Sequence, residues 1–385
     1  MRQQSGSTAK KKLGVVFGSR SVEHEVSIIT AVQMMKQVPR EEFAVVPLYV
    51  DKKGSWWTGS ALENIEFFKT LDLQNPQESA GDALERVSFS PDPTVDHGID
   101  VAIFCTHGGH GEDGTLAGLF ELADIPYAAP GVPAAGVAID KLLFKHVMQA
   151  AGLPVTPYVW MSRHEWQSAR KEMVERVENS LKYPLFVKPV TLGSSVGVTR
   201  AADERELKIA LDLAAEFDTR LLVEEAAREC IEVNVSVIGG EENIQVSTTE
   251  QPLQTDEYLS YADKYERGGK KAGGAKGMAS LSRRIPAPIT PDLTESIRAA
   301  TQKIWRLLGG KGVARIDFFA NLSTDEFWVG EVNAPPGSLA FYLWEASGKT
   351  YAELITDIVA HAESVHAEKH ELMHSIPSNI LQKDL

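Results

Sequence analysis

Two pairs of polar residues late in the chain have the types and spacing of a divalent-cation site. Arg315 and Asp317 are two residues apart, as are Glu331 and Asn333, and both pairs fall in apolar, strand-like stretches. Residues two apart on a strand share one face of a sheet. Carboxylate and amide oxygens suit Mg2+ held together with a phosphate, and an arginine beside them can stabilise an anionic intermediate. A solvated sheet face with a cross-strand ion pair explains the four residues equally well.

A glycine–serine turn, Gly193–Gly197, lies between two predicted strands and offers free backbone N–H groups. Such a turn can fold over phosphate oxygens. Lys188 precedes it on the incoming strand, and Lys141 opens an earlier predicted helix. In a chain of formal net charge −14, two lysines beside this turn fit a polyphosphate, although each is also explained as a surface charge. The GxxxxGK[ST] pattern of P-loop enzymes is absent from the sequence.

Two short motifs suggest other enzymes, and their context argues against both. Gly109–Gly114 matches GxGxxG, but its free positions are Glu112 and Asp113, which would repel a pyrophosphate, and no acidic residue for a ribose follows about 20 residues later. Gly193–Gly197 matches GxSxG, but Val196–Thr199 favours a strand where a nucleophile elbow needs a helix. We therefore expect neither a nicotinamide-dependent enzyme nor an α/β-hydrolase.

Length and composition narrow the class of protein. The 385 residues suggest two or three domains. The 43% hydrophobic and 24% charged residues are typical of a globular protein. The acidic charge argues against a nucleic-acid or anionic-membrane partner, and we find no apolar run of membrane-spanning length. With only two cysteines and no signal peptide recognised, we expect a cytoplasmic protein whose residues 1–12 form a loose tail.

The elements that must position these residues follow from hydrophobic periodicity. The early alternation of strands and helices predicts a parallel α/β unit, whereas 51–98 reads as irregular and 239–242 as a hairpin turn. We place soft domain boundaries near 130 and 224. The sequence predicts strands at 13–17, 43–50, 99–106, 183–190, 196–200, 219–224, 231–238, 313–319 and 326–332, and helices at 23–38, 114–123, 140–151, 203–216, 291–308 and from about 351.

From about Leu13 to Ala362 the chain resembles the D-alanine–D-alanine ligase family of the ATP-grasp superfamily. The resemblance rests on motifs that occur in the order of the family. They are Ser21–Ser27, His107–Gly114, Ile139–Lys141, Phe186–Pro189, Gly193–Gly197, Tyr261–Tyr265, Ala314–Asp317 and Glu331–Asn333.

The resemblance implies three α/β domains with ATP between the middle and C-terminal ones: an N-terminal substrate domain (1–129), a middle ATP-grasp domain (130–224) and a C-terminal ATP-grasp and metal domain (225–385). It implies that ATP phosphorylates the carboxylate of one D-alanine and that the amine of a second attacks the acyl phosphate. The product, D-alanyl-D-alanine, serves peptidoglycan synthesis and thereby cell-wall biogenesis and cell shape. Implied partners are amino-acid substrates and a second copy in a homodimer, and implied cofactors are ATP and two Mg2+ ions, with Mn2+ as a substitute.

The resemblance also implies roles for individual residues. Glu23, Ser194 and Tyr265 would form a hydrogen-bonded triad, and Arg315 would stabilise the tetrahedral intermediate. In the family, a tyrosine at the position of Tyr265 accompanies attack by an amine, which forms a peptide, rather than attack by a hydroxyl group, which forms a depsipeptide. The implied assignments are Lys141, Lys188, Ser194, Ser195, Glu224, Glu232 and Lys264 for ATP, Asp317, Glu331 and Asn333 for Mg2+, Glu23 and His107 for the first D-alanine, and Glu23, Ser194, Tyr265 and Arg315 for catalysis.

The segment after Asn333 departs from the family pattern. Ala334 stands where the family has threonine, and the stretch from Gly337 to Trp344 is about four residues short. By direct count Tyr342 falls where the family's serine binds the second substrate's carboxylate, and Ser338 is the nearest serine that could replace it. Gly337, Ser338 and Tyr342 are therefore the candidates for that contact, and a different acceptor amine in secondary metabolism stays open. A nucleotide-binding paralogue without activity is a further alternative.

Two other features stand outside these motifs. The glycine- and lysine-rich segment 266–278 reads either as a basic lid over ATP or as an insert without a role. His366, His370 and His374 are spaced by four residues along the last predicted helix. We expect them on an exposed polar face rather than in a metal site, because no complete ligand set is visible.

Overall fold

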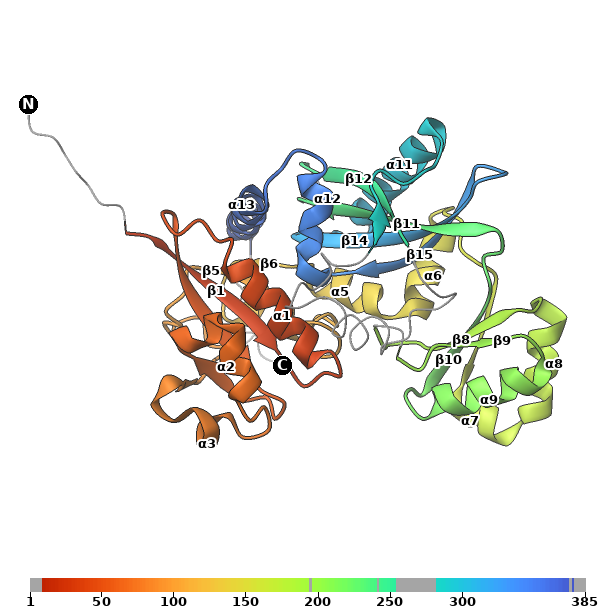
Figure 1. Cartoon of the computed structure of the whole chain (residues 1–385), viewed down its shortest axis with the longest axis horizontal. Coiled ribbons are helices and arrows are strands. Elements are labelled where there is room, and N and C mark those ends of the chain that lie inside the picture. Colours follow the sequence, from red (N-terminus) through yellow and green to blue (C-terminus); the bar gives the residue numbers. More distant parts are fainter. Residues whose placement is uncertain (1–8, 194–195, 241, 254–281, 374–375, 377–385) are drawn as a thin grey trace, which may run out of the picture.

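The computed structural model describes residues 9–193, 196–240, 242–253, 282–373 and 376. Three β-sheets organise these residues, and each sheet is covered by its own helices (Figure 1). In the figure the first sheet lies at the left in red and orange, the second at the right in green, and the third between them in teal and blue. Ser194, Ser195, Lys264, Tyr265 and the segment 266–278 lie outside the described residues.

The first sheet has six strands in the order β4-β3-β2-β1-β5-β6. Its central strand β1 pairs in parallel with β2 and β5, and its residues from Leu13 to Phe17 are buried, as expected for a strand covered on both faces. The predicted parallel unit is thus confirmed. Its elements are β1 Lys11–Gly18, α1 His24–Met35, β2 Phe43–Val50, β3 Trp56–Thr58, η1 Ser60–Glu63, α2 Ile65–Thr70, α3 Pro76–Ala80, η2 Gly81–Ala83, β4 Glu85–Val87, β5 Val101–Phe104, α4 Thr115–Leu122 and β6 Tyr127–Ala128.

The irregular interpretation of 51–98 is wrong. This stretch adds β3 and β4 to the sheet as antiparallel strands and contributes the short helices α2 and α3. Strands of three residues are too short to show an alternating pattern, so sequence periodicity does not reveal them. Trp57 nevertheless anchors β3, because its indole is buried and donates a 2.9 Å hydrogen bond to Asp51.

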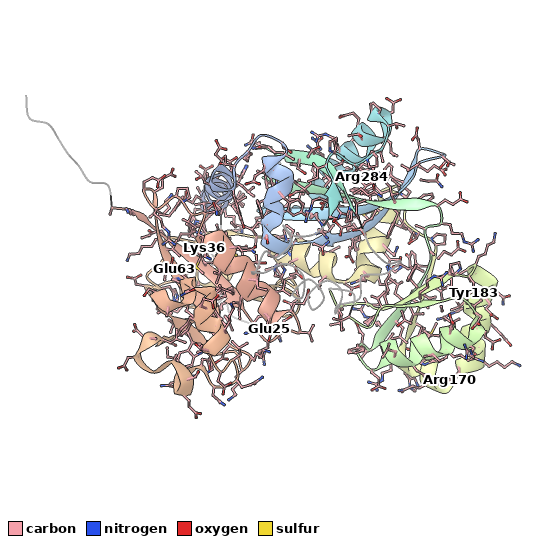
Figure 2. The ribbon with its side chains drawn as sticks, in the orientation of Figure 1. Glu25, Lys36, Glu63, Arg170, Tyr183 and Arg284 are labelled. Carbon is pink, nitrogen blue, oxygen red and sulfur yellow. The ribbon has the colours of Figure 1, made fainter. Side chains whose placement is uncertain are left out.

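The second sheet is antiparallel throughout, in the order β7-β10-β8-β9. Two of its helices begin at residues that cap them: Ser162 and Glu165 form a capping box at α7, and Asp203 accepts from the Glu206 amide at α9. Tyr183 and Arg170 mark this unit in Figure 2, apart from Arg284 at the third sheet. The elements are β7 Tyr158–Ser162, α7 Arg163–Ser168, α8 Arg170–Ser180, β8 Leu185–Pro189, β9 Thr199–Ala201, α9 Glu204–Ala215 and β10 Arg220–Glu225.

The third sheet runs β13-β12-β11-β14-β15 and is also antiparallel. Two helices from before the second sheet pack on it, because Ala138, Phe144 and Met148 share a buried core with Val235 and Ile316. The domain boundaries at 129/130 and 224/225 stay a prediction. The elements are α5 Val132–Ile139, α6 Lys141–Ala150, β11 Cys230–Ile238, β12 Gln245–Pro252, β13 Arg283–Arg284, α11 Pro291–Leu307, β14 Val313–Asn321, β15 Glu326–Asn333, η5 Gly337–Ala340, α12 Phe341–Glu345 and α13 Tyr351–His370.

The last helix, α13, returns to the first sheet. Its Leu354, Ile355 and Ile358 are buried in one core with Val101 and Ile103 of β5 (Figure 1). The two ends of the described chain are therefore joined in a single packed region. Among the described helices, none has the length and apolar character needed to cross a bilayer.

An ion-pair group ties the end of α13 to α4. Glu121 accepts hydrogen bonds from Lys369, Tyr127 and Lys311. Burial alone would raise the pKa of Glu121, but these donors outweigh it and lower the pKa to about 2. Glu121 is therefore ionised in the folded protein over a range in which the unfolded chain begins to bind a proton.

Glu121→Gln is expected to lower the free energy of unfolding at pH 7 by about 1 kcal/mol, the upper end for partly exposed ion pairs. Because the pKa of Glu121 is lowered in the folded state, its ion pairs stabilise the protein fully above the ordinary value of 4.5. This stabilisation is lost as the pH falls toward 2. Urea unfolding of both proteins across this range checks the prediction, with the exposed Glu371→Gln as control. A stability difference that stays constant across the range would contradict it.

Candidate active site

A buried carboxylate holds two lysines at the junction of β8 and β10. Glu224 is 4% exposed, and its Oε1 lies 3.2 Å from Lys188 Nζ, while its Oε2 lies 3.3 Å from Lys145 Nζ. Thr156 donates to the same Oε2 at 2.9 Å. Burial alone would raise the pKa of Glu224, but the two ammonium groups outweigh it and lower the pKa to about 2. The carboxylate is thus ionised and fixes the position of Lys188.

Lys141 lies at the start of α6, directly after the capping residue Asp140. Its backbone N–H donates to Val190 O at 3.0 Å, and its ammonium donates to Leu192 O at 2.5 Å. Both acceptors belong to the segment that leads into the glycine–serine turn. The structure therefore brings Lys141 beside that turn, as the sequence predicts, and Arg220 pairs with Asp140 beneath it.

The predicted metal ligands lie on two neighbouring strands in matching register. Asp317 of β14 is opposite Glu331 of β15, and Arg315 is opposite Asn333. Arg315 binds Asp317 through two hydrogen bonds of 2.6 Å, one to each carboxylate oxygen. Asn333 Nδ2 donates to Asp317 Oδ2 at 2.9 Å. The four residues named from their spacing thus form one connected group.

Negative charge accumulates at this group. Burial raises the pKa of Asp317 despite the opposing effect of Arg315, and the carboxylates of Glu232 and Glu331 add to the rise. Burial also opposes the charge on Arg315, but Asp317 outweighs it and keeps the pKa of the guanidinium well above its usual value. Three carboxylates around one guanidinium leave an excess of negative charge, which a divalent cation would balance.

The lysine pair and the acidic group face one another. Glu331 is close enough to act on the charge of Lys145, whose pKa is lowered chiefly by burial. The second and third sheets therefore present cationic and anionic side chains to a common region. Such an arrangement can hold a polyphosphate on its lysines and a phosphate-bound cation on its oxygen ligands. The donor set fits Mg2+, which prefers carboxylate and amide oxygens.

Glu23 lies in the loop between β1 and α1. It is 5% exposed. Gly193, which directly precedes the serines of the turn, approaches it so closely that a Cβ there would lie 2.8 Å from Glu23 Oε2. Gly108 makes a similar approach, with a Cβ position 2.7 Å from the same oxygen. A side chain at either place would displace the Glu23 carboxylate, and Gly108 also has a left-handed φ of +72°. The turn, Glu23 and the segment after β5 therefore meet there.

His107 follows β5 and joins three parts of the chain. Its Nε2 lies 3.1 Å from Thr30 Oγ1 on α1, and its Nδ1 lies 3.5 Å from Glu112. The same Thr30 hydroxyl accepts the backbone N–H of Ser338 at 3.3 Å. His107 is thus buried between the first sheet and the segment predicted to bind the second substrate.

That segment forms η5 and α12. The Ser338 hydroxyl donates to Gln33 at 2.8 Å and is buried, and residues 338–340 all have left-handed backbone angles with φ near +50°. The Tyr342 hydroxyl donates to Glu250 at 2.8 Å. The guanidinium of Arg283 lies 3.6 Å from the centre of the Tyr342 ring and pairs with Glu250 at 3.0 Å.

Both misleading motifs have structural explanations. In Gly109–Gly114, Asp113 accepts the His110 amide, and Glu112 accepts the Gly108 amide just before it. These acids satisfy amides that a dinucleotide loop would offer to a pyrophosphate. After Gly197 the chain enters β9, which pairs with β8, and no helix begins before Glu204. The arguments against a nicotinamide enzyme and a hydrolase are therefore supported.

Sequence reasoning missed several residues of this region, including Lys145, Thr30, Glu250 and Arg283. Lys145 and Thr30 lie on helices, where a polar residue on the buried side is the one available signal. Glu250 lies on β12, which the sequence did not predict beyond a hairpin turn. Arg283 follows the glycine- and lysine-rich segment and carries no motif of its own.

Comparison with known proteins accounts for this arrangement. The family profile "D-ala D-ala ligase N-terminus" matches residues 12–130, and "D-ala D-ala ligase C-terminus" matches 147–360. A D-alanine–D-alanine ligase of Bacillus velezensis is 36% identical over 372 residues, or 94% of this chain and 100% of that protein. One from Bacillus licheniformis is 34% identical over 373 residues, or 95% of this chain and 99% of that protein.

Solved structures agree with these matches. The VanG D-Ala:D-Ser ligase from Enterococcus faecalis is 27% identical with a TM-score of 0.75, covering 92% of this chain and 99% of that one. A D-alanine–D-alanine ligase from Bacillus anthracis complexed with ATP shares the fold at 22% identity and a TM-score of 0.67, covering 94% of this chain and 100% of that one. The fold is ATP-grasp, and the chain belongs to the D-alanine–D-alanine ligase family.

Proposed function

We propose that the lysines around Glu224, the acidic group around Asp317 and the Glu23–His107 region form one ligase site. The chain is an ATP-dependent ligase of the D-alanine–D-alanine type, which joins two D-alanines into D-alanyl-D-alanine for peptidoglycan synthesis. The observation that carries the assignment of the site is the cross-strand group of Arg315, Asp317, Glu331 and Asn333, because its donors suit both a phosphate-bound cation and an anionic intermediate.

The chemistry explains why these charges are needed. A carboxylate resists nucleophilic attack, and transfer of the γ-phosphoryl group from ATP removes its charge and creates a leaving group. Lys141 and Lys188 neutralise the phosphates, with Ser194, Ser195 and Lys264 assigned to the same task. Glu224 and Glu232 serve the adenosine part of ATP. Rapid attack then depends on holding the two amino acids close together, which contributes more than any single charge.

The first D-alanine is placed between Glu23 and His107. The buried Glu23 carboxylate binds the ammonium group of this substrate, and the close approach of Gly193 supports a connection with Ser194 and Tyr265 in a triad. Arg315 stabilises the oxyanion that forms when the second amine attacks the acyl phosphate. The amine then loses a proton, and the intermediate collapses to the dipeptide and phosphate.

We assign Asp317, Glu331 and Asn333 as ligands for two Mg2+ ions, for which Mn2+ can substitute. Ions held there would supply positive charge that neutralises the phosphates during transfer. We further propose that the enzyme works as a homodimer in the cytoplasm. The acidic chain with two unpaired cysteines supports that compartment.

The second substrate is bound near Gly337, Ser338 and Tyr342, and the structure gives a reason to test other acceptors. The Ser338 hydroxyl is engaged with Gln33, and Tyr342 is held between Arg283 and Glu250. Phosphate release is measured with ATP, Mg2+ and D-alanine, then with a panel of D- and L-amino acids, and products are identified by mass. Turnover with D-alanine alone supports the dipeptide. Turnover only with a second amine moves the enzyme to another pathway, and no release with any pair favours an inactive paralogue.

Tyr342→Phe is expected to raise KM for the acceptor about fivefold and to leave KM for ATP unchanged. The substitution removes the hydrogen bond to Glu250, worth about 1 kcal/mol, and keeps the aromatic ring beneath Arg283. Steady-state kinetics with varied amino acid and varied ATP separate the two constants. Tyr183→Phe is the control, because that hydroxyl bonds Glu178 on the surface of the second unit. Equal KM values for acceptor in wild type and Tyr342→Phe would remove Tyr342 from the acceptor site.

A further inference from the structure

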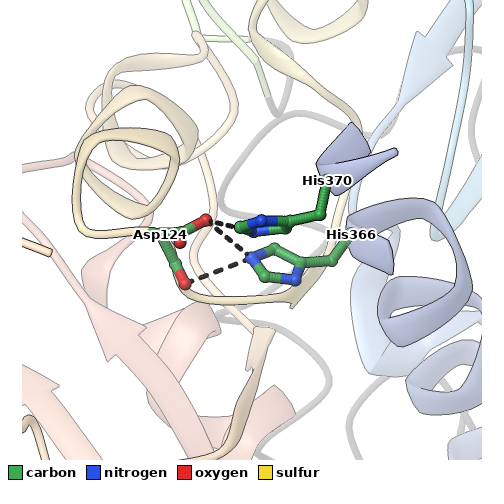
Figure 3. A group of neighbouring side chains, drawn as sticks. All are labelled: Asp124, His366 and His370. Carbon is green, nitrogen blue, oxygen red and sulfur yellow. Dashed lines mark hydrogen bonds and ion pairs between the residues drawn. The ribbon is translucent and has the colours of Figure 1, made fainter. Parts of the chain in front are cut away.

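Two histidines of α13 and an aspartate after α4 converge on one point, and none of the three belongs to the ligase site described above. The Nε2 atoms of His366 and His370 each lie 2.9 Å from Asp124 Oδ1, and His366 Nε2 also lies 3.1 Å from the Asp124 carbonyl oxygen (Figure 3). One ligand atom from each of the three residues can be chosen so that all lie within 4.8 Å of one another. This convergence is what a metal site requires of its protein ligands.

The backbone explains how the three residues meet. His366 and His370 are four residues apart on α13 and therefore project from the same face of the helix. Asp124 follows the end of α4 in a left-handed conformation with φ of +56°, which turns the chain toward that face. The expectation that these histidines form only a polar face is thus incomplete, because the third ligand comes from 242 residues away in the sequence. His374 lies outside the described residues.

Asp124 is the acidic group of the cluster, and the ammonium groups beside it are paired with another carboxylate. Asp124 Oδ1 lies within hydrogen-bond distance of both ring nitrogens, so its carboxylate brings negative charge between the two imidazoles. The nearby ammonium groups of Lys369 and Lys311 pair with Glu121. The cluster also lines a cavity of about 400 Å3, so that an ion and its water can reach it from solvent.

We propose that Asp124, His366 and His370 form a Zn2+ site that fastens the end of α13 to the turn between α4 and β6. Two imidazoles and one carboxylate are a ligand set that zinc takes, and water completes the four positions. An all-oxygen set would instead suit Mg2+, so this site differs in metal from the acidic group around Asp317. Around a tetrahedral zinc ion with bonds of about 2.0–2.1 Å, ligand atoms lie about 3.3–3.4 Å apart, so both Nε2 atoms must move slightly away from Asp124 Oδ1 to admit the ion. The side chains are 26–52% exposed and have room to do so.

The alternative is a hydrogen-bonded cluster that never takes up metal. In that case one carboxylate oxygen serves both rings, and Zn2+ has no effect on the protein. The two cases differ in a measurable way, because a metal bound only by the folded chain stabilises it, while a hydrogen-bonded cluster does not respond.

The test uses the full chain without a histidine tag, stripped of metal and equilibrated with Zn2+ in excess Mg2+, which competes for the acidic group around Asp317. Bound zinc is counted by elemental analysis, and thermal unfolding is followed with and without Zn2+. The variants are His370→Ala, His366→Ala and Asp124→Asn, and the control is His164→Ala on α7, an exposed histidine outside the cluster.

The expected result is one more Zn2+ per chain in wild type and His164→Ala than in the three cluster variants, with a Zn2+-dependent rise in melting temperature lost in the same variants. Ligase activity of the cluster variants with Mg2+ stays at the wild-type level, which shows that they fold. Asp124→Asn keeps the shape of the side chain and separates loss of a ligand from loss of packing. Equal zinc content in all five proteins, or no zinc in any, would overturn the proposal.

Discussion

Replacement of Arg315 by lysine is expected to lower kcat for dipeptide formation by about 10²–10³-fold, the range for losing one oxyanion-stabilising donor. Arg315 holds Asp317 through two parallel hydrogen bonds, which only a planar guanidinium can make. Lysine keeps the charge but supplies one compact ammonium. The substitution therefore disturbs both the intermediate and the position of Asp317, while the global charge of the protein stays the same.

The measurement is kcat by phosphate release, together with KM for ATP and circular dichroism to confirm folding. Arg306→Lys, on the exposed face of α11, is the matched control and is expected to keep wild-type kcat. A kcat for Arg315→Lys within twofold of wild type would remove Arg315 from the reaction. A large rise in KM for ATP with unchanged kcat would instead place it in nucleotide binding.

Much of the fold was predictable because the longer elements carry a clear period. The buried runs at β1 and β2, the alternation of β11 and the amphipathic pattern of α11 all appear close to their predicted ranges. The shared face of Arg315 and Asp317, and that of Glu331 and Asn333, was also predictable, because residues two apart on a strand point to the same side of the sheet. Family likeness then supplied the roles that spacing alone leaves open.

What could not be predicted depends on contacts between distant segments. Lys145 is a buried lysine only because Glu224 and Thr156 meet it from other elements. Asp124 meets the α13 histidines through the return of the last helix to the first sheet. β3 and β4 are three residues long and are stabilised by pairing rather than by local pattern. In each case the contacting residue is distant in the sequence, so neither composition nor local periodicity predicts the contact.

Glu224→Gln is expected to lower the free energy of unfolding at pH 7 by about 3–5 kcal/mol, the cost of leaving a buried charge without its partner. Lys145 is 2% exposed and Lys188 side chain 19%, and both ammonium groups lose their carboxylate. Urea unfolding measures the loss. Glu225→Gln is the control on the same strand, since Glu225 accepts the Lys182 amide at the surface.

The pH dependence of that loss separates a charge effect from a packing effect. Burial already lowers the pKa of Lys145 below its ordinary value of 10.5, and removal of Glu224 lowers it further. Because the pKa of Lys145 is lower in the folded state than in the unfolded chain, the folded protein binds fewer protons between the two values. The stability of Glu224→Gln therefore rises with pH between the lowered folded-state pKa and 10.5. Adding Lys145→Met removes the buried ammonium and is expected to recover much of the loss, because an apolar replacement of a buried pair is often neutral. A deficit that is the same at every pH and persists in the double variant would show that Glu224 acts through shape and hydrogen bonding to Thr156 rather than through its charge.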